Sequence, residues 1–211
     1  MTRANASTTG RPLPAWIRIA LLAICICVGG VNDTYAFTLG ADDKAALMAG
    51  QAVVKVAEDP TGDADALIQA AIDLPYATPR IFAVLLDCKR SLRYVRGLKS
   101  CKVLERSADG LSEIREHRSQ WQSLFPETVS VFRADYTLDK EIRFQKVRGD
   151  LRFLKGVWRL APIKGGAATR LTYEARVGIN APVPGFMVRD ALQSDLAALL
   201  QALRVEVGRT R

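Results

Sequence analysis

The second half of the chain combines a series of short strand-like segments with one long amphipathic helix. Five segments bounded by turn residues read as strands: 111–121, 129–136, 141–147, 153–160 and 169–177. Gly156, inside the fourth, is expected to mark a β-bulge. After them, apolar residues recur in steps of three and four from Val188 through Leu192 and Leu196 to Leu203, as on one face of an α-helix. An antiparallel sheet with one apolar face needs a cover. The order therefore predicts an α+β fold in which a curved antiparallel sheet wraps around this helix.

The region before these strands predicts a hairpin followed by two short helices. Thr78 suits the N-cap position of the first helix, with Pro79 in its first turn and apolar residues continuing to Leu86. A second short helix is expected around residues 92–95, ending at Gly97. The hairpin is expected from two strand-like segments and the turn sequence between them: 52–57, 66–74 and 59–63.

Three stretches of the chain carry a family resemblance: Phe82–Asp87 with Tyr94–Leu104, Gly156–Leu160 with Thr169–Tyr173, and Pro184–Arg189. They resemble START-like, helix-grip domains of the SRPBCC superfamily. The similarity is greatest to the polyketide cyclase/dehydrase and coenzyme Q-binding branch and extends over about residues 66–205. It implies the helix-grip architecture, with two short helices after the first hairpin, and supports the fold better than any activity.

The first 36 residues have the pattern of a secretory signal peptide. Residues 1–18 contain three arginines and no acid, the run Ile19–Val28 is apolar, and small residues end the segment at Ala36. The apolar run is shorter than the roughly 20 residues that span a bilayer. We expect cleavage after Ala36 and export to the periplasm or cell envelope; the alternative is an uncleaved N-terminal membrane anchor.

The mature chain is expected to consist of a flexible lead-in, residues 37–50, and a START-like domain, residues 51–207. Only Cys88 and Cys101 remain after removal of the signal peptide. In an exported protein, two cysteines favour one disulfide, although two buried thiols are an alternative. A loop of this length would stabilise the fold by roughly 3 kcal/mol if it is unstrained.

The composition points to a basic soluble domain. The chain has 30 Lys and Arg against 22 Asp and Glu, a net charge of +8. Without residues 1–36, which hold three arginines and Asp33, the net charge is +6. Acids and bases alternate along the chain, so solubility is the simplest explanation, and transient contact with an anionic membrane surface is the alternative. The sequence has no platform of basic and aromatic residues typical of nucleic-acid binders, so nucleic-acid binding is not expected.

Aromatic residues spread over successive strands indicate an apolar cavity. In a helix-grip fold one wall serves both the core and the cavity, so ordinary core packing is the competing interpretation. Phe186 and Met187 follow a Pro- and Gly-rich segment, and they would either gate the mouth of the cavity or make the first core contacts of the helix. The expected ligand-binding residues are Trp121, Phe132, Tyr136, Phe144, Trp158, Tyr173, Phe186, Met187 and His117.

His117 is the only histidine of the chain, which excludes a site that needs several imidazoles, and no metal site is expected. Strand alternation places it on one face with Arg115 and Trp121. On the inner face it would bind a polar head group or transfer a proton; otherwise it is an ordinary strand histidine. The strand carboxylates Glu113, Glu116, Asp135 and Glu174 have no spacing that specifies a catalytic pair, and solvated salt bridges are the simpler interpretation.

These observations favour an exported, non-catalytic binder or carrier of a hydrophobic small molecule such as a lipid, quinone or polyketide-like compound. No cofactor is expected, and no P-loop, G-x-S-x-G or H-E-x-x-H motif is present. The alternative is a cyclase or aromatase that uses His117 and a carboxylate on a bound substrate. A third possibility is an interaction module of the cell envelope with a filled core.

Overall fold

The structure is a computed structural model of the chain, and it describes residues 37–120, 127–180 and 184–209. The predicted signal peptide, residues 1–36, lies outside these ranges and stays a prediction. Trp121 also lies outside them, so its proposed contact with a ligand stays a prediction as well. Among the described residues, no helix is both long and apolar enough to cross a membrane.

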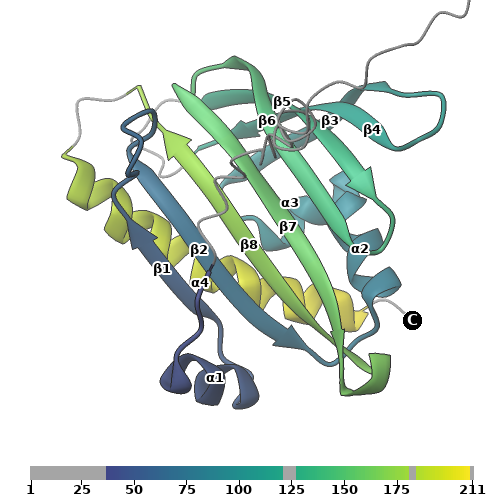
Figure 1. The fold of residues 1–211 in the computed structure, drawn as a ribbon. Coiled ribbons are helices and arrows are strands. Elements are labelled where there is room, and N and C mark those ends of the chain that lie inside the picture. The colour runs from purple at the N-terminus through teal and green to yellow at the C-terminus, as the bar shows by residue number, and fades with distance from the viewer. Residues whose placement is uncertain (1–36, 121–126, 181–183, 210–211) are drawn as a thin grey trace, which may run out of the picture. The chain divides into compact units, whose positions relative to one another are not determined.

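Antiparallel strands form one curved sheet (Figure 1). Their order across the sheet is β1-β2-β8-β7-β6-β5-β4-β3, so the hairpin β1–β2 joins the later meander through β8. All the predicted strand segments are strands in the structure. One further strand, β3, lies between β2 and β4 along the chain. The bounds are β1 Val53–Ala57, β2 Ala66–Leu74, β3 Leu98–Arg106, β4 Ser112–Ser119, β5 Thr128–Thr137, β6 Glu141–Gly149, β7 Phe153–Ile163 and β8 Ala168–Gly178.

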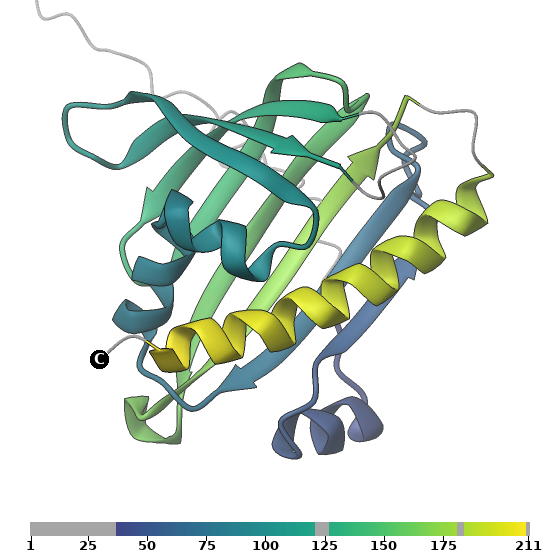
Figure 2. The ribbon, with the colours of Figure 1, turned by 180° about the vertical axis from the view of Figure 1, so that it is seen from behind.

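Three helices cover one side of this sheet, as Figure 2 shows: α2 (Thr78–Leu86), α3 (Cys88–Tyr94) and α4 (Gly185–Arg209). Pro79 stands in the first turn of α2, but the N-cap is Ala77 and not Thr78 as predicted. Asp87 ends α2 and caps α3, because its carboxylate accepts hydrogen bonds from the amides of Lys89 and Arg90.

The long helix α4 buries the stripe that the sequence predicts. Val188, Leu196, Leu200, Leu203 and Val207 are buried on its inner side. All of these except Val188 pack with the apolar side chains of β2 and α2 in the main core. The α+β helix-grip architecture, a curved sheet wrapped around a C-terminal helix, is thereby confirmed.

Residues 41–48 form a helix, α1 (Ala41–Met48), where the sequence analysis expects a flexible lead-in. Leu47 is only 1% exposed and packs with Val53 and Ala71 in a second, smaller core. Neighbouring residues of a strand face opposite sides of the sheet, and Ala70 and Ile72 belong to the main core. The second core therefore lies on the side of the sheet away from α4, which composition alone does not reveal.

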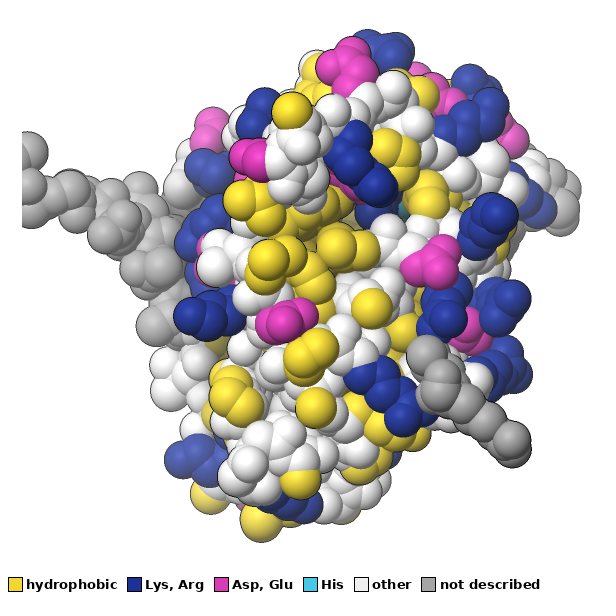
Figure 3. All heavy atoms as spheres, turned by 90° about the vertical axis from the view of Figure 1, so that its right-hand side faces the viewer, with side chains coloured by type: hydrophobic (Ala, Val, Ile, Leu, Met, Phe, Trp, Pro, Cys, Tyr) yellow, Lys and Arg dark blue, Asp and Glu magenta, His cyan; other side chains and the backbone are white. Residues whose placement is uncertain are grey.

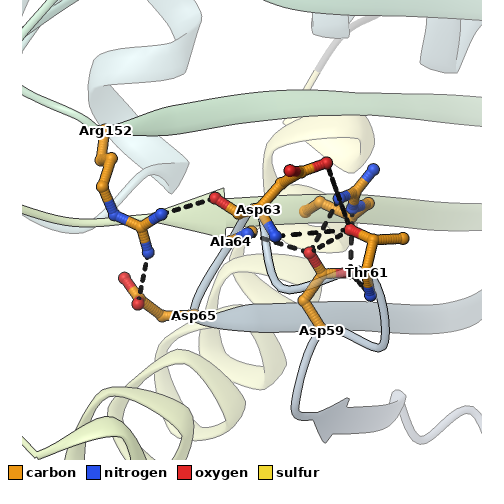
Figure 4. A network of polar contacts seen from close by, with 7 residues as sticks. Asp59, Thr61, Asp63, Ala64, Asp65 and Arg152 are labelled. Atoms are coloured by element: carbon orange, nitrogen blue, oxygen red, sulfur yellow. Dashed lines mark hydrogen bonds and ion pairs between the residues drawn. The ribbon is translucent and has the colours of Figure 1, made fainter.

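The turn between β1 and β2 is tied by arginines to β8 and to the segment just before β7, and Figure 4 shows the contacts of Arg152. Arg176 on β8 donates hydrogen bonds to both carboxylate oxygens of Asp59, at 3.0 and 2.8 Å, and to Asp63 and Thr61. Arg152 donates to Asp65 and to the carbonyl of Asp63, both at 2.6 Å. The turn is predicted by its residue types, whereas its partners come from the far end of the chain.

Gly156 is not a bulge, contrary to the sequence prediction. The pairing of β7 with β6 and with β8 runs without a shift, and Gly156 lies opposite both Phe144 and Ala175. A Cβ at this position would lie 2.5 Å from Phe144 Cζ and 2.6 Å from the carbonyl oxygen of Glu174. Glycine is therefore present because a neighbouring ring crosses the strand here.

Candidate ligand cavity

A cavity of about 220 Å³ lies between the inner face of the sheet, helices α2 and α3, and helix α4. Most of its wall is apolar, and strands β4 to β8 supply the sheet side. The side chains that line it are Leu85, Leu86, Ser91, Tyr94, Val95, Arg115, His117, Phe132, Ala134, Tyr136, Ile142, Phe144, Leu154, Trp158, Tyr173 and Leu199.

Six of the nine predicted binding residues lie on this wall: His117, Phe132, Tyr136, Phe144, Trp158 and Tyr173. Trp121 lies outside the described residues. Phe186 and Met187, in the first turn of α4, are 59% and 50% exposed and are not among the residues that line the cavity, and their role at its mouth stays a prediction. The α4 stripe turns inward only from Val188 onward.

The aromatic part of the wall is organised around Tyr173. The rings of Phe144 and Tyr173 stack at 5.9 Å between centroids, and Trp158 lies 4.3 Å from Tyr173. Phe144 reaches this position across Gly156, where no Cβ obstructs it. The result is a continuous aromatic surface, which suits a flat apolar ligand.

Arg115 on the cavity wall belongs to a buried ion pair with Glu113, whose role the sequence analysis missed. Arg115 donates to Glu113 at 2.7 Å and to the carbonyl of Leu86 at 2.8 Å, and it also reaches Leu85. Burial alone would raise the pKa of Glu113, but Arg115, Tyr136 and Arg106 hold it below its usual range. The alternation that places Arg115 and His117 on one face also places Glu113 there, so the signal was present in the sequence.

His117 is a neutral imidazole at physiological pH. Burial, with the nearby charge of Arg115, lowers the pKa of His117 to about 4, although Glu113 acts in the other direction. The ring meets Phe132 edge to face at 4.9 Å. Its Nε2 atom is buried without a hydrogen-bond partner among the described residues. No carboxylate of the described chain accepts a hydrogen bond from that nitrogen.

A groove of about 310 Å³ between the end of α3 and α4 adjoins the cavity, and Tyr94, Val95 and Leu199 line both. Arg96 Nη1 lies 3.6 Å from Asp195 across it. Figure 3 views the side on which α2 and α3 lie in Figure 1, and it shows hydrophobic side chains gathered in a hollow among charged ones. The groove and the cavity therefore share part of their wall, and Arg93 and Arg96 add charged side chains to the groove.

The predicted disulfide is present. Cys88 and Cys101 are bonded, with their Cα atoms 5.3 Å apart, within the usual range. The bond ties the first residue of α3 to the edge strand β3. It therefore fixes one end of the helix whose other end borders both the cavity and the groove.

Comparison with known structures supports this fold. A START superfamily protein from Mycobacterium smegmatis has a TM-score of 0.61 at 20% identity, over 69% of this chain and 99% of that one. A STAR-related lipid transfer protein from Xanthomonas axonopodis has a TM-score of 0.62 at 15% identity, over 75% of this chain and 94% of that one. The Zhui aromatase/cyclase from Streptomyces sp. R1128 has a TM-score of 0.57 at 12% identity, over 68% of this chain and 93% of that one.

At these identities the likeness shows the fold alone. No curated protein matches the sequence. The family model described as polyketide cyclase / dehydrase and lipid transport, however, matches residues 74–204, more than half of the chain. These residues run from the end of β2 into α4 and include the whole described wall of the cavity. The chain belongs to the polyketide cyclase/dehydrase and lipid transport family.

Proposed function

We propose that this protein is a non-catalytic binder or carrier of a hydrophobic small molecule, held between the sheet and α4. The observation that carries the proposal is the cavity, whose wall is mainly aliphatic and aromatic. Buried aromatic surface gives affinity for apolar ligands, while few polar groups fix their orientation. The family's link to lipid transport agrees with this role.

The size of the cavity limits what it holds. Its volume of about 220 Å³ is below the roughly 300–1,000 Å³ typical of small-molecule pockets. A compact ring system fits this space. A longer molecule, such as a quinone or lipid with a tail, would place one end here and continue into the groove between α3 and α4.

A cyclase or aromatase is the second candidate, because an aromatase/cyclase shares the fold and His117 lies on the cavity wall. Such an enzyme needs a base and a carboxylate on one substrate. Glu113 is held by Arg115 and Arg106, and a histidine with a pKa of about 4 is a weak base. The described geometry thus favours binding over turnover.

We also propose that the mature domain acts outside the cytoplasm, in the periplasm or cell envelope. The disulfide supports an oxidising compartment. The exposed pair Phe186 and Met187, followed by Arg189, is the part of α4 that we propose to touch a membrane surface during ligand exchange. Fractionation of cells that express the full chain tests the location, and retention in the cytoplasm would contradict it.

The experiment for the binding function is native mass spectrometry of the protein exported from cells and purified without reductant. We expect an additional mass that organic solvent releases. The variant Ala134→Leu fills the cavity wall at a buried position, and Ala161→Leu adds the same group to an exposed position of β7. The first should lose the additional mass and the second should retain it.

Two results would contradict the proposal. One is retention of the ligand by the cavity-filled variant at unchanged stoichiometry. The other is a protein that carries no additional mass and also fails to bind added naphthalene. Conversion of a bound compound in the unaltered protein, lost on His117→Phe, would favour the cyclase instead.

A further inference from the structure

We propose that the ligand carries an uncharged hydroxyl group and that His117 is the residue that binds it. This inference rests on the proposed binding function and names the chemical class of the ligand. It separates phenols and alcohols, which the cavity would select, from fatty acids and other carboxylates, which it would reject.

The first step is the state of the polar atoms on the cavity wall. Among the described residues, His117 Nε2 and Tyr136 Oη are the buried side-chain atoms of this wall that make no hydrogen bond of regular geometry. Tyr136 faces the carboxylate of Glu113, which raises its pKa together with burial, so its proton has an acceptor nearby. His117 Nε2 has none.

His117 Nε2 is the unpartnered nitrogen that the cavity wall presents to a ligand. Ser130, opposite His117 in the pairing of β4 with β5, also has a buried hydroxyl without a partner among the described residues, but it does not line the cavity. The ring of Phe132 packs edge to face on His117 at 4.9 Å and holds it in place. A buried polar atom without a partner on a cavity wall is a place that a ligand's polar group completes.

The second step is charge. Arg115 is the cation on the cavity wall, and its guanidinium is occupied by Glu113 and by the carbonyls of Leu85 and Leu86. A buried carboxylate without a partner is strongly disfavoured. A ligand carboxylate would lie beside a neutral imidazole and near the charge of Glu113. The described wall therefore offers nothing that compensates an anion.

The third step is the kind of neutral group. Nε2 donates in one imidazole tautomer and accepts in the other. A hydroxyl both donates and accepts, so it pairs with His117 in either tautomer. A carbonyl pairs only with the donating tautomer. Hydroxyl chemistry is thus the best match to His117 Nε2.

The experiment compares naphthalene, 2-naphthol and 2-naphthoate at neutral pH, with affinities measured by isothermal titration on the mature protein freed of its own ligand. The three probes share one ring system and differ in the group offered to His117. We expect 2-naphthol to bind about fivefold more tightly than naphthalene, as for one net hydrogen bond. We expect 2-naphthoate to bind roughly tenfold more weakly than 2-naphthol, or worse.

Three variants assign the preference. In His117→Phe the ratio of the 2-naphthol affinity to the naphthalene affinity should fall from about five to about one. Ser91→Ala is the matched control, because Ser91 lines the cavity but its hydroxyl already donates to the carbonyl of Cys88 at 2.7 Å. Tyr136→Phe removes the other hydroxyl. Ser91→Ala should keep the preference, whereas loss of the preference in Tyr136→Phe but not in His117→Phe would assign the ligand hydroxyl to Tyr136 and overturn the inference.

Equal binding of 2-naphthol and naphthalene, tighter binding of 2-naphthoate, or a preference that survives His117→Phe would each overturn the inference. The comparison of probes on the unaltered protein needs no variant, so it holds even where a substitution impairs folding. Failure of all three probes to bind would instead contradict the binding function itself, which keeps the two proposals distinguishable.

Discussion

At the scale of single residues, burial decides which side chains carry chemistry. His117, Glu113 and Arg115 alternate along β4 and all face inward, but only the histidine keeps an unpartnered atom. Glu113, which resembles a surface carboxylate in the sequence, is 3% exposed and forms ion pairs with Arg106 and Arg115. Identical sequence spacing thus yields one candidate ligand-binding group and one internal ion pair.

The stability of the protein should fall as His117 becomes protonated. The ordinary pKa is 6.5 and the folded value is about 4, so the unfolded chain takes up the proton first. The stabilisation is complete above pH 6.5 and decreases as the pH falls from 6.5 to 4, by up to about 3 kcal/mol. Urea unfolding of His117→Phe should show a flatter pH dependence in this window. Parallel curves for the two proteins would disprove this origin.

Asp59 should act in a lower pH window. Burial would raise its pKa, but hydrogen bonds from Arg176, the Ala64 amide and Thr61 lower it from 3.8 to about 2. Its stabilisation is complete above pH 3.8 and disappears as the pH falls toward 2, about 2 kcal/mol in all. Asp59→Asn should lack this component in acid unfolding, with Asp139→Asn, in the turn between β5 and β6, as the control.

Gly156 should not tolerate a methyl group. Alanine would push against Phe144 and against the backbone of Glu174, neither of which can move freely within the sheet. We expect a loss of about 2 kcal/mol in the free energy of unfolding, together with weaker naphthalene binding because Phe144 shifts into the cavity. Gly40→Ala is the control, since a Cβ there meets only Asp43 at 3.6 Å. Equal stability of both variants would contradict the argument.

At the scale of elements, the disulfide determines how firmly α3 is held. Replacing Cys88 and Cys101 with serine should lower the free energy of unfolding by roughly 3 kcal/mol, as for a loop of this length. Removal of the disulfide should also speed up hydrogen exchange of the Ser91–Tyr94 amides in α3, which borders the cavity. The exchange of the β8 amides should increase less. An unchanged exchange pattern would show that packing alone holds α3.

Strong periodicity made the elements predictable where it was long. The stripe on α4 and the strands of the meander were predicted because every turn or pair of residues repeats the same signal. α1 was missed because its eight residues carry a single buried side chain, Leu47. Gly156 was misassigned as a bulge because a glycine within a strand has the same appearance whether it kinks the strand or admits a ring.

At the scale of the whole molecule, the sheet carries a core on each side. The main core with α4 holds the cavity, and the smaller one joins α1 to the other side of β1 and β2. Leu47→Ala should therefore lower the free energy of unfolding by about 2–3 kcal/mol without changing the affinity for naphthalene. Met48→Ala, 80% exposed, should change neither. A loss of binding in Leu47→Ala would mean that the two cores are coupled.

Local patterns in the sequence are enough to predict the helix-grip fold, the Cys88–Cys101 disulfide and six of the residues that line the cavity wall. These depend on local periodicity and residue type, which a single chain displays directly. The tertiary structure alone decided which polar groups have partners, because Arg115, Arg176 and Arg152 reach oxygens about 30 to 117 positions away. The size of the cavity depends on the spacing between the sheet and its covering helices. No local sequence pattern specifies that spacing.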